Sequence, residues 1–414
     1  MTKKKKYITV ICIVLAAIVA GLLAFLLIRN KDVIDHIPAK SKAVVVITPS
    51  NEETGEALQQ LMRNIVNLNV EGLDFTEPSY VFITPNEYYG MAIKVDNKDK
   101  VAQSFPNQKI EEGDGAQWLW FGDAWQLCWT DDVFLALGPS TIEDQAHVRR
   151  TLSIMLDASA DEGFGHTDRY KQMMASDGDI RLFSKLEVIP MPYNLPFKMC
   201  IPDTCEAEKV LIYANAKNEG GKWLADCNIT SEDEDILRIM DTAEKKNTQI
   251  STVEPEGVGC NNLLFMAGNA EYGQLSKIIN KDNTMQMLFA SFNDSTNVKQ
   301  KIKEMTGGYS FCIENIDENL HTACLLTGKT KEGSPVVIES KKKLSKAAFE
   351  GAKISEQVKG LKFYFHLNFL PLQNNKALQE KHPTLVKLFG NIKSITYKAT
   401  TNRTAKTEVE TYQK

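Results

Sequence analysis

The longest apolar run of the chain lies at its N-terminus. Tyr7 to Ile28 is a run of 22 residues without a charged side chain or a proline. At ~1.5 Å rise per residue a helix of this length spans about 33 Å, and the hydrocarbon core of a bilayer is about 30 Å thick. Four lysines, Lys3 to Lys6, precede the run, whereas the positive charges Arg29 and Lys31 after it are offset by two aspartates. This asymmetry predicts a cytoplasmic N-terminus and a body on the far side of the membrane.

Two other uses of an N-terminal apolar run fit less well. A cleaved signal peptide has an apolar region of about 7–15 residues and then a small-x-small cleavage site, whereas this run is longer and exits through Phe25 to Ile28. A lipoprotein signal needs a cysteine after the run, and Cys12 lies in its middle. We therefore expect an uncleaved, single-pass signal anchor (residues 7–28) in the cytoplasmic (inner) membrane, with residues 1–6 inside and the body in the periplasm.

Beyond a polar tether (29–42), the apolar pattern alternates between short β-like runs and helical spacing. The first copy of this order is the strand Ala43 to Ile47, a helix with apolar Leu58, Leu61, Met62 and Ile65 on one face, and the strands Tyr80 to Ile83 and Tyr88 to Val95. A strand, a helix and an antiparallel hairpin then recur about three more times, beginning near residues 143, 263 and 363. The sequence predicts an α+β fold with an N-terminal transmembrane helix followed by repeated strand–helix–antiparallel hairpin units.

The last strands show the clearest period of two. Phe363, Phe365 and Leu367 alternate with more polar residues, which is typical of a half-buried strand. Thr404 to Tyr412 is predicted to direct Lys406, Glu408 and Glu410 to one face and Ala405, Thr407 and Val409 to the other. A proline-rich stretch at residues 190–202 interrupts any central strand, so we expect two α+β halves, 43–195 and 196–414.

Charge and cysteine content narrow the class of protein. Four of the 48 lysines and arginines precede the apolar run, which leaves 44 against 53 acidic residues and a net charge of −9 for the rest of the chain. A body of that sign should not bind nucleic acid through its phosphates. Seven cysteines lie beyond residue 28, and Cys200 and Cys205 are candidates for a disulfide if the compartment is oxidising.

The most distinctive local feature is a tryptophan-rich segment from Trp118 to Trp129. Gly122-Asp123 suits a two-residue type II′ turn, which would pair Trp120 with Trp125. Alternation then predicts one face that carries four tryptophans, Trp118, Trp120, Trp125 and Trp129. Such a face is either packed against the core or is a candidate aromatic surface for a sugar or a protein partner.

Two segments of the chain resemble a family of bacterial cell-envelope proteins of unknown function. They are His36 to Ile47 and Gly72 to Phe82, and a Gly-Gly-Tyr segment at 307–309 is in keeping with them. Members are typical of Gram-negative anaerobes and are usually exported as lipoproteins. This chain departs from the pattern in having no lipobox cysteine. The resemblance implies no catalytic residues.

Motifs that suggest chemistry have simpler structural explanations. Thr327 to Thr330 looks like the end of a phosphate-binding loop, but Ala323 stands where the motif needs glycine and a strand follows. The acids from Glu232 to Asp235 lack the spacing of a calcium loop and suit a helix start with Ser231 as N-cap. The six histidines form no zinc motif. We assign no catalytic, cofactor-binding or metal-ligating residue and expect no cofactor.

The sequence therefore favours a membrane-anchored, extracytoplasmic protein with a non-enzymatic binding or assembly role in the bacterial envelope. Its partners would be the membrane, through the N-terminal helix, and an envelope protein or a glycan. The alternative is an extracytoplasmic hydrolase-type enzyme whose site is assembled from distant residues. A deep pocket with converging His, Asp, Glu or Ser side chains would favour the enzyme.

Overall fold

The computed structural model describes residues 31–48, 70–122, 124–190, 193–219, 222–250, 258–270, 273–281, 286, 295–319, 321–382 and 392–411. Eighteen strands lie within these ranges, and they pair with one another in antiparallel fashion. The chain folds into two compact units. Of the described residues, unit 1 comprises 31–41, Val70–Asp74 and Tyr88–Asp168, and unit 2 comprises 42–48, 75–87 and those from Arg169 onward.

Unit 1 is a sheet in which neighbouring strands are mostly joined by short loops. From one edge to the other its order is β5 (Glu111–Gly113), β6 (Ala116–Phe121), β7 (Trp125–Trp129), β8 (Val133–Gly138), β4 (Tyr89–Val95) and β2 (Leu73–Asp74). Helix α4 (Gln145–Asp157) packs against β7 and β8. Val148, Leu152 and Met155 face inward from α4 because their spacing of three and four residues places them on one side of the helix. The helical elements α3 (Lys98–Gln103), η2 (Ile142–Asp144), η3 (Ala160–Glu162) and η4 (Phe164–His166) complete the unit.

The segment before β1 is docked on unit 1 by both apolar and polar contacts. It forms the short helix η1 (Val33–His36), with Ile34 and Ile37 buried. The Nζ atom of Lys31 donates to the carbonyls of Met155 and Leu156 at 2.9 and 3.2 Å, and Nδ1 of His36 lies 3.0 Å from the carbonyl of Met155. These carbonyls belong to the last turn of α4, where a helix leaves its C=O groups unsatisfied. The segment therefore caps the C-terminus of α4.

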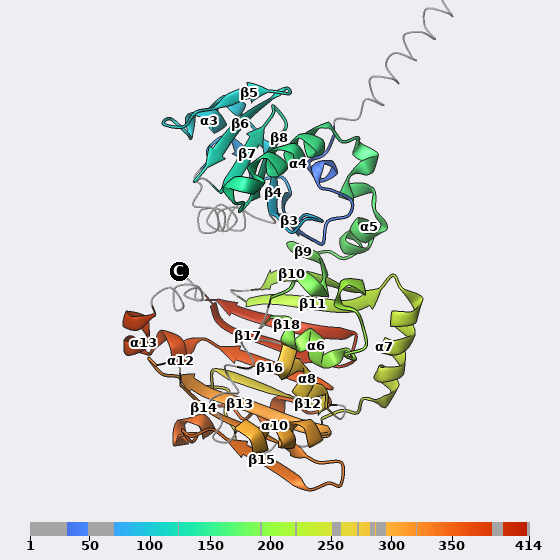
Figure 1. The fold of residues 1–414 in the computed structure, drawn as a ribbon, viewed down its shortest axis with the longest axis vertical. Coiled ribbons are helices and arrows are strands. Elements are labelled where there is room, and N and C mark those ends of the chain that lie inside the picture. Colours follow the sequence, from blue (N-terminus) through green and yellow to red (C-terminus); the bar gives the residue numbers. More distant parts are fainter. Residues whose placement is uncertain are drawn as a thin grey trace, which may run out of the picture. The chain divides into compact units, whose positions relative to one another are not determined.

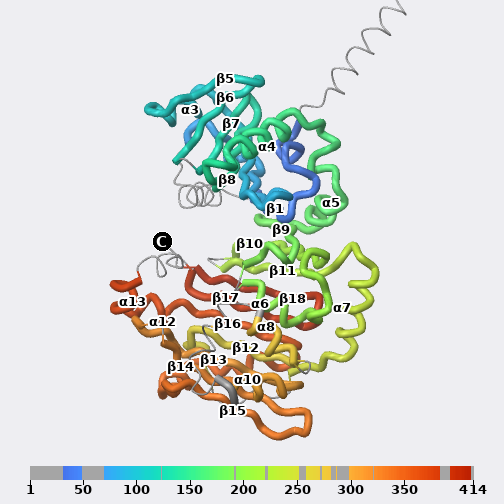
Figure 2. The backbone as a smooth tube through the Cα atoms, in the orientation of Figure 1, coloured from blue at the N-terminus to red at the C-terminus, as the bar shows by residue number. Residues whose placement is uncertain are grey.

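Unit 2 is built on one long antiparallel sheet. Its order is β3 (Ser79–Ile83), β1 (Ala43–Ile47), β9 (Ile180–Lys185), β10 (Val210–Glu219), β11 (Lys222–Ser231), β18 (Thr404–Thr411), β17 (Ile392–Ala399), β16 (Phe363–Asn368), β12 (Leu264–Ala270), β13 (Gly307–Ile316), β14 (Thr322–Lys329) and β15 (Pro335–Glu339). Figure 2 shows the red C-terminal strand β18 beside the yellow-green strand β11, with β17 on the other side of β18. The last strand of the chain thus lies in the interior of the sheet.

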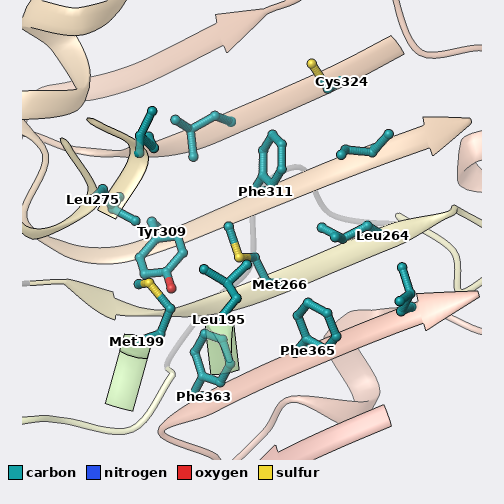
Figure 3. Packing of buried hydrophobic residues seen from close by; sticks show 14 of the residues in the cluster. Leu195, Met199, Leu264, Met266, Leu275, Tyr309, Phe311, Cys324, Phe363 and Phe365 are labelled. Carbon is teal, nitrogen blue, oxygen red and sulfur yellow. The ribbon is translucent and has the colours of Figure 1, made fainter. Parts of the chain in front are cut away.

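One face of this sheet carries the main hydrophobic core. Helices α6 (Leu195–Cys200), α8 (Gln274–Lys281) and α10 (Ser295–Glu304) lie over that face (Figure 1). Their apolar residues, such as Leu195 and Leu275, pack on Met266, Phe311 and Phe365 of three adjacent strands (Figure 3). Alternation turns the intervening residues to the opposite face.

Beneath β12 and β16 the opposite face is covered too. Phe265 and Tyr364 pack there against Ile354 of α11 (Ile354–Gln357) and against Leu361. A separate cluster joins β10 and β11 to α7 (Glu234–Lys246) through Ile212, Ile229 and Ile236. The remaining helical elements of the unit are α5 (Asp168–Met174), α12 (Leu370–Gln373), α13 (Lys376–Lys381), η5 (Leu186–Val188), η6 (Ala207–Lys209) and η7 (Lys346–Phe349).

The predicted fold class is wrong. The structure is dominated by large antiparallel sheets, and its helices do not recur once per hairpin as the predicted repeat requires. Successive strands instead follow one another directly, as in β6–β7–β8 and β13–β14–β15, because short loops favour antiparallel neighbours. The predicted helix with Leu58 and Ile65 lies outside the described residues. The predicted boundary after residue 195 falls inside helix α6 (Leu195–Cys200).

The membrane predictions also need correction. In the described ranges no helix combines the length and the apolar composition that crossing a bilayer requires. The expected anchor, Tyr7 to Ile28, lies outside those ranges. The predicted transmembrane helix, single-pass signal anchor and inner-membrane location with a periplasmic body are therefore not borne out by the part of the chain that the structure describes.

Because the main hydrophobic core of unit 2 is tightly buried, truncating the ring of Phe365 should strongly lower the free energy of unfolding. Phe365 is 3% exposed within the main core, whereas Phe349 is 36% exposed and serves as a matched control. Phe365→Ala should lower the free energy of unfolding by about 3–5 kcal/mol because the cavity left behind does not refill. Phe349→Ala should change it by less than about 1 kcal/mol. Urea titrations of both variants test this, and equal effects would contradict the core assignment.

The contact of His36 with α4 predicts a pH dependence. Burial, with a contribution from the charge on Lys31, lowers the pKa of His36 from 6.5 to about 4. Between these values the unfolded chain binds more protons than the folded one, so stability is full above pH 6.5 and is lost as the pH falls toward 4. The full loss amounts to about 3 kcal/mol.

Tryptophan fluorescence measures this effect in unit 1, which contains Trp118, Trp120, Trp125 and Trp129. His36→Asn is the matched variant, because its amide keeps a donor near the position of Nδ1 but does not titrate. Its stability should change less than that of the wild type between pH 6.5 and 4. If the stability of the two proteins falls equally with pH, His36 is not the cause of the pH dependence.

Candidate functional site

The predicted tryptophan face is divided by the register of its hairpin. Trp125 pairs with Phe121 rather than with Trp120, so the loop has three residues instead of two. A shift of one residue moves a side chain to the other face of a sheet. Trp118 and Trp120 therefore lie on one face, and Trp125 and Trp129 lie on the other.

Two of the four tryptophans are almost fully buried. Trp118 and Trp129 are each 1% exposed. The Trp118 indole N–H donates to the carbonyl of Gly113 at 2.9 Å, and the guanidinium of Arg149 lies 5.0 Å from the ring centre. Trp129 stacks on Phe134. The four rings consequently form no single exposed surface, and Trp118 and Trp129 support the core of unit 1.

The cysteines and histidines in the described ranges are bound into the fold. Cys200 and Cys205 are free thiols, so the candidate disulfide is not formed in this structure. Burial raises the pKa of Cys200 to about 12 and that of Cys205 to about 11, which makes both poor nucleophiles. His366 uses both ring nitrogens, on the Thr396 hydroxyl at 2.9 Å and on the Cys260 carbonyl at 3.2 Å. The described residues contain no group of three potential metal ligands.

The two motifs that suggested chemistry have structural roles. Thr327 to Thr330 leads from β14 into the turn before β15, so a strand follows the segment as predicted. The acidic segment does begin helix α7, but its N-cap is Asp233, whose carboxylate accepts from the backbone N–H groups of Asp235 and Ile236. Ser231, the predicted N-cap, accepts from the backbone of Asp233 instead.

One cavity of unit 2 lies near the end of β12. Most of the polar side chains that line it already make hydrogen bonds to other protein groups. It has a volume of about 290 Å³ and is lined by amides from several elements. Asn247 donates to Asn402 at 2.7 Å, Asn269 donates to the Thr248 carbonyl, and Thr306 donates to the Ala270 carbonyl at 3.4 Å. These bonds hold the loops together, so few groups remain for a ligand.

A larger cavity lies where β10, β11 and β18 run side by side. We call it the seam cavity, because it spans the boundary between β11 and the C-terminal strand β18. Its volume is about 470 Å³, and α5 and the residues just after it form its wall. Two rows of side chains cross the three strands on its floor. They are Tyr213, Asn228 and Thr404 in one row and Asn215, Asp226 and Lys406 in the next.

The second row contains two opposite charges that stand side by side. Asp226 on β11 and Lys406 on β18 are register partners, and both are exposed. Neither makes a hydrogen bond or an ion pair with any residue that the structure describes. On the same face of β18, Glu408 pairs with Lys398 at 3.1 Å and Glu410 pairs with Lys222 at 2.6 Å. Glu408 and Glu410 are therefore neutralised by lysines, whereas Asp226 and Lys406 are paired with no described residue.

The first row adds neutral hydrogen-bonding groups. Tyr213 and Asn228 are register partners on β10 and β11. Burial is the main cause that raises the pKa of Tyr213 to about 12, so its hydroxyl keeps its proton at neutral pH. Both side chains line the cavity and can bond to a polar ligand.

The α5 wall of the cavity is fastened to the sheet. Arg169 donates to both carboxylate oxygens of Glu232, at 2.7 and 2.6 Å, and its guanidinium lies 5.3 Å from the centre of the Phe183 ring. Arg181 donates to the carbonyl of Ser176 at 2.8 Å. Met173 lines the cavity and is 2% exposed. The wall is therefore held in place without a ligand.

The chemistry of the seam cavity suits binding more than catalysis. Its lining contains one carboxylate, one ammonium and one tyrosine hydroxyl, but no histidine and no activated nucleophile. Sequence reasoning identified the face of β18 that carries Lys406, and the strand Thr404–Thr411 confirms that prediction. It did not identify Asp226, because no local pattern reveals that β11 and β18 are neighbours.

Comparison with known proteins adds little. No family model and no curated protein matches the chain. Among solved structures, crystal form III of TP0453 aligns with a TM-score of 0.33 at 7% identity over 52% of this chain and 88% of its own. Crystal form IV of the same protein aligns with a TM-score of 0.32 at 7% identity over 48% and 81%. Values this low establish no common fold, and we draw nothing from them.

The attachment of α5 leads to a test of the wall. Arg169→Lys keeps the positive charge but loses the two-pronged contact with Glu232 and the flat contact with Phe183. Amide hydrogen exchange in α5 should accelerate several-fold, with a loss of about 1 kcal/mol in stability at most. Arg238→Lys, at an exposed pair with Asp235 on α7, is the matched control. Unchanged exchange in the Arg169 variant would show that other contacts hold the wall.

Proposed function

We propose that this chain is a non-catalytic binding protein that holds a small polar ligand in the seam cavity. The observation that carries the proposal is the pair Asp226 and Lys406, which bond to none of the described residues and lie on the floor of a 470 Å³ cavity. That volume lies in the lower part of the range for small-molecule sites, about 300–1,000 Å³. A few uncommitted polar groups beside an apolar wall are the usual composition of such sites.

We further propose that this binding serves the bacterial envelope, where the protein would contact an envelope protein or a glycan. The support is the resemblance of His36 to Ile47 and Gly72 to Phe82 to an envelope family of unknown function. The net charge of −9 beyond the first 28 residues disfavours nucleic acid as a partner. The hydrolase-type alternative gains no support from the seam cavity, where no histidine accompanies Asp226 and Ser176.

A thermal-shift panel tests the binding role. The probes are L-leucine, glucose, succinate and putrescine, which represent a zwitterion, a neutral polyol, a dianion and a dication. At a concentration of 100 times Kd a ligand stabilises the folded state by about 2.7 kcal/mol, so a bound probe should raise the midpoint by a few degrees. We expect at least one class to do so.

A blocked cavity provides the control. Ala175→Trp introduces a large ring from an exposed position of the wall, and Ala347→Trp introduces the same ring at an exposed position that does not line the cavity. The shift should disappear in the first variant and persist in the second. The proposal fails if no probe shifts the midpoint, or if the shift survives in Ala175→Trp.

A further inference from the structure

We propose that the ligand of the seam cavity is a free α-amino acid, bound as a zwitterion between Asp226 and Lys406. The Asp226 carboxylate would receive the ammonium group, and the Lys406 ammonium would receive the carboxylate. The aliphatic part of the ligand would lie toward Met173 on the wall. This inference rests on the proposed function and specifies its ligand class.

The two protein charges have a spacing that matches the two charges of an amino acid. Directly opposed side chains on adjacent antiparallel strands have Cβ atoms about 4.5–5.5 Å apart. Asp226 and Lys406 are opposed in this way, so their charged ends can lie a few ångströms apart. In an α-amino acid the ammonium and the carboxylate are attached to the same carbon. The ligand therefore presents two opposite charges at a comparable spacing, whereas the two termini of a peptide are separated by its whole length.

The two protein charges do not neutralise each other. Lys398 and Glu408, which lie on the adjacent strands β17 and β18, approach to 3.1 Å. Asp226 and Lys406 form no such contact, although their register would permit one. A ligand with a single charge would satisfy one of them and shield the other from water, which is unfavourable. A zwitterion satisfies both at once.

Neutral hydrogen-bonding groups lie in the row next to the two charges. The Tyr213 hydroxyl is a donor at neutral pH and can bond to a polar group of the ligand from the β10 side of the cavity. The amide of Asn228 offers both a donor and an acceptor, and Thr404 offers a hydroxyl. An ammonium group has three donors and a carboxylate has several acceptor sites, so each needs more than its one charged partner. The first row supplies these additional partners.

The cavity has room for an aliphatic side chain beside the charges. Met173 and Ala175 line the cavity together with Gln172 and Ser176. Met side chains adapt to aliphatic groups of different shape. A cavity of about 470 Å³ has room for one amino acid with some water. The expected ligands therefore include aliphatic amino acids.

Calorimetric titration of the full chain with three isosteric probes tests the inference. L-leucine carries both charges, L-leucinamide lacks the carboxylate, and 4-methylpentanoate lacks the ammonium. We expect L-leucine to bind and the other two to bind at least tenfold more weakly. Equal affinity for either of the singly charged probes would overturn the zwitterion assignment.

Variants assign the two charges to residues. Asp226→Asn and Lys406→Met should each weaken L-leucine binding at least tenfold, and both side chains are exposed, so the unfolding midpoint should stay nearly unchanged. Glu408→Gln lies on the same face of β18 but outside the cavity lining, and it should bind L-leucine as the wild type does. Wild-type affinity in either cavity variant would overturn the inference.

The outcomes separate this inference from the proposed function. If glucose, succinate or putrescine binds in a way that Ala175→Trp abolishes while L-leucine does not bind, the seam cavity remains a binding site and the zwitterion is excluded. If no probe binds in a way that Ala175→Trp abolishes, the proposed function and the zwitterion inference both fail. Weaker L-leucine binding in both charge variants, with Glu408→Gln unaffected, supports both.

Discussion

The pairing of β11 with β18 is the interaction on which the rest of unit 2 depends. Seven register pairs, from Asn228 opposite Thr404 to Lys222 opposite Glu410, join strands that are about 180 residues apart in the chain. On one side of this seam lie β10, β9, β1 and β3, and on the other side lie β17, β16 and the remaining strands. Closing so long a loop has an entropic cost that the seam and the core beneath it must offset. Without the seam the sheet would be two separate sheets with exposed edges.

The two faces of the seam have different roles. On one face Ala405 and Cys227 lie opposite each other within the main hydrophobic core, together with Tyr397 of β17. Alternation places Asp226 and Lys406 on the other face, which α5 covers only in part. The same register therefore stabilises the fold and creates the seam cavity. Chain segments that are far apart in sequence each supply one charge.

Local patterns in the sequence predicted local structure well and distant pairing poorly. The alternation from Thr404 onward identified the exposed face of β18, because a period of two is a property of one strand. Which strand lies beside β18 is decided by packing across the whole unit, so Asp226 could not be recognised from sequence. The tryptophan hairpin shows a smaller failure of the same kind. Its strands were correctly located, but a three-residue loop shifted the register by one and separated Trp118 from Trp129. The repeat failed because similar apolar patterns serve both strands that continue a sheet and helices that cover it.

The most direct test of this account is to observe the two charges while an amino acid binds. Carboxyl carbon and lysine Nζ resonances can be followed by NMR during a titration of the full chain with L-leucine. The account predicts that Asp226 and Lys406 shift in a saturable manner with one shared Kd, while Glu408 and Lys398 on the same face stay still. Saturable binding without a shift at Asp226 and Lys406, or no binding at all, would contradict it.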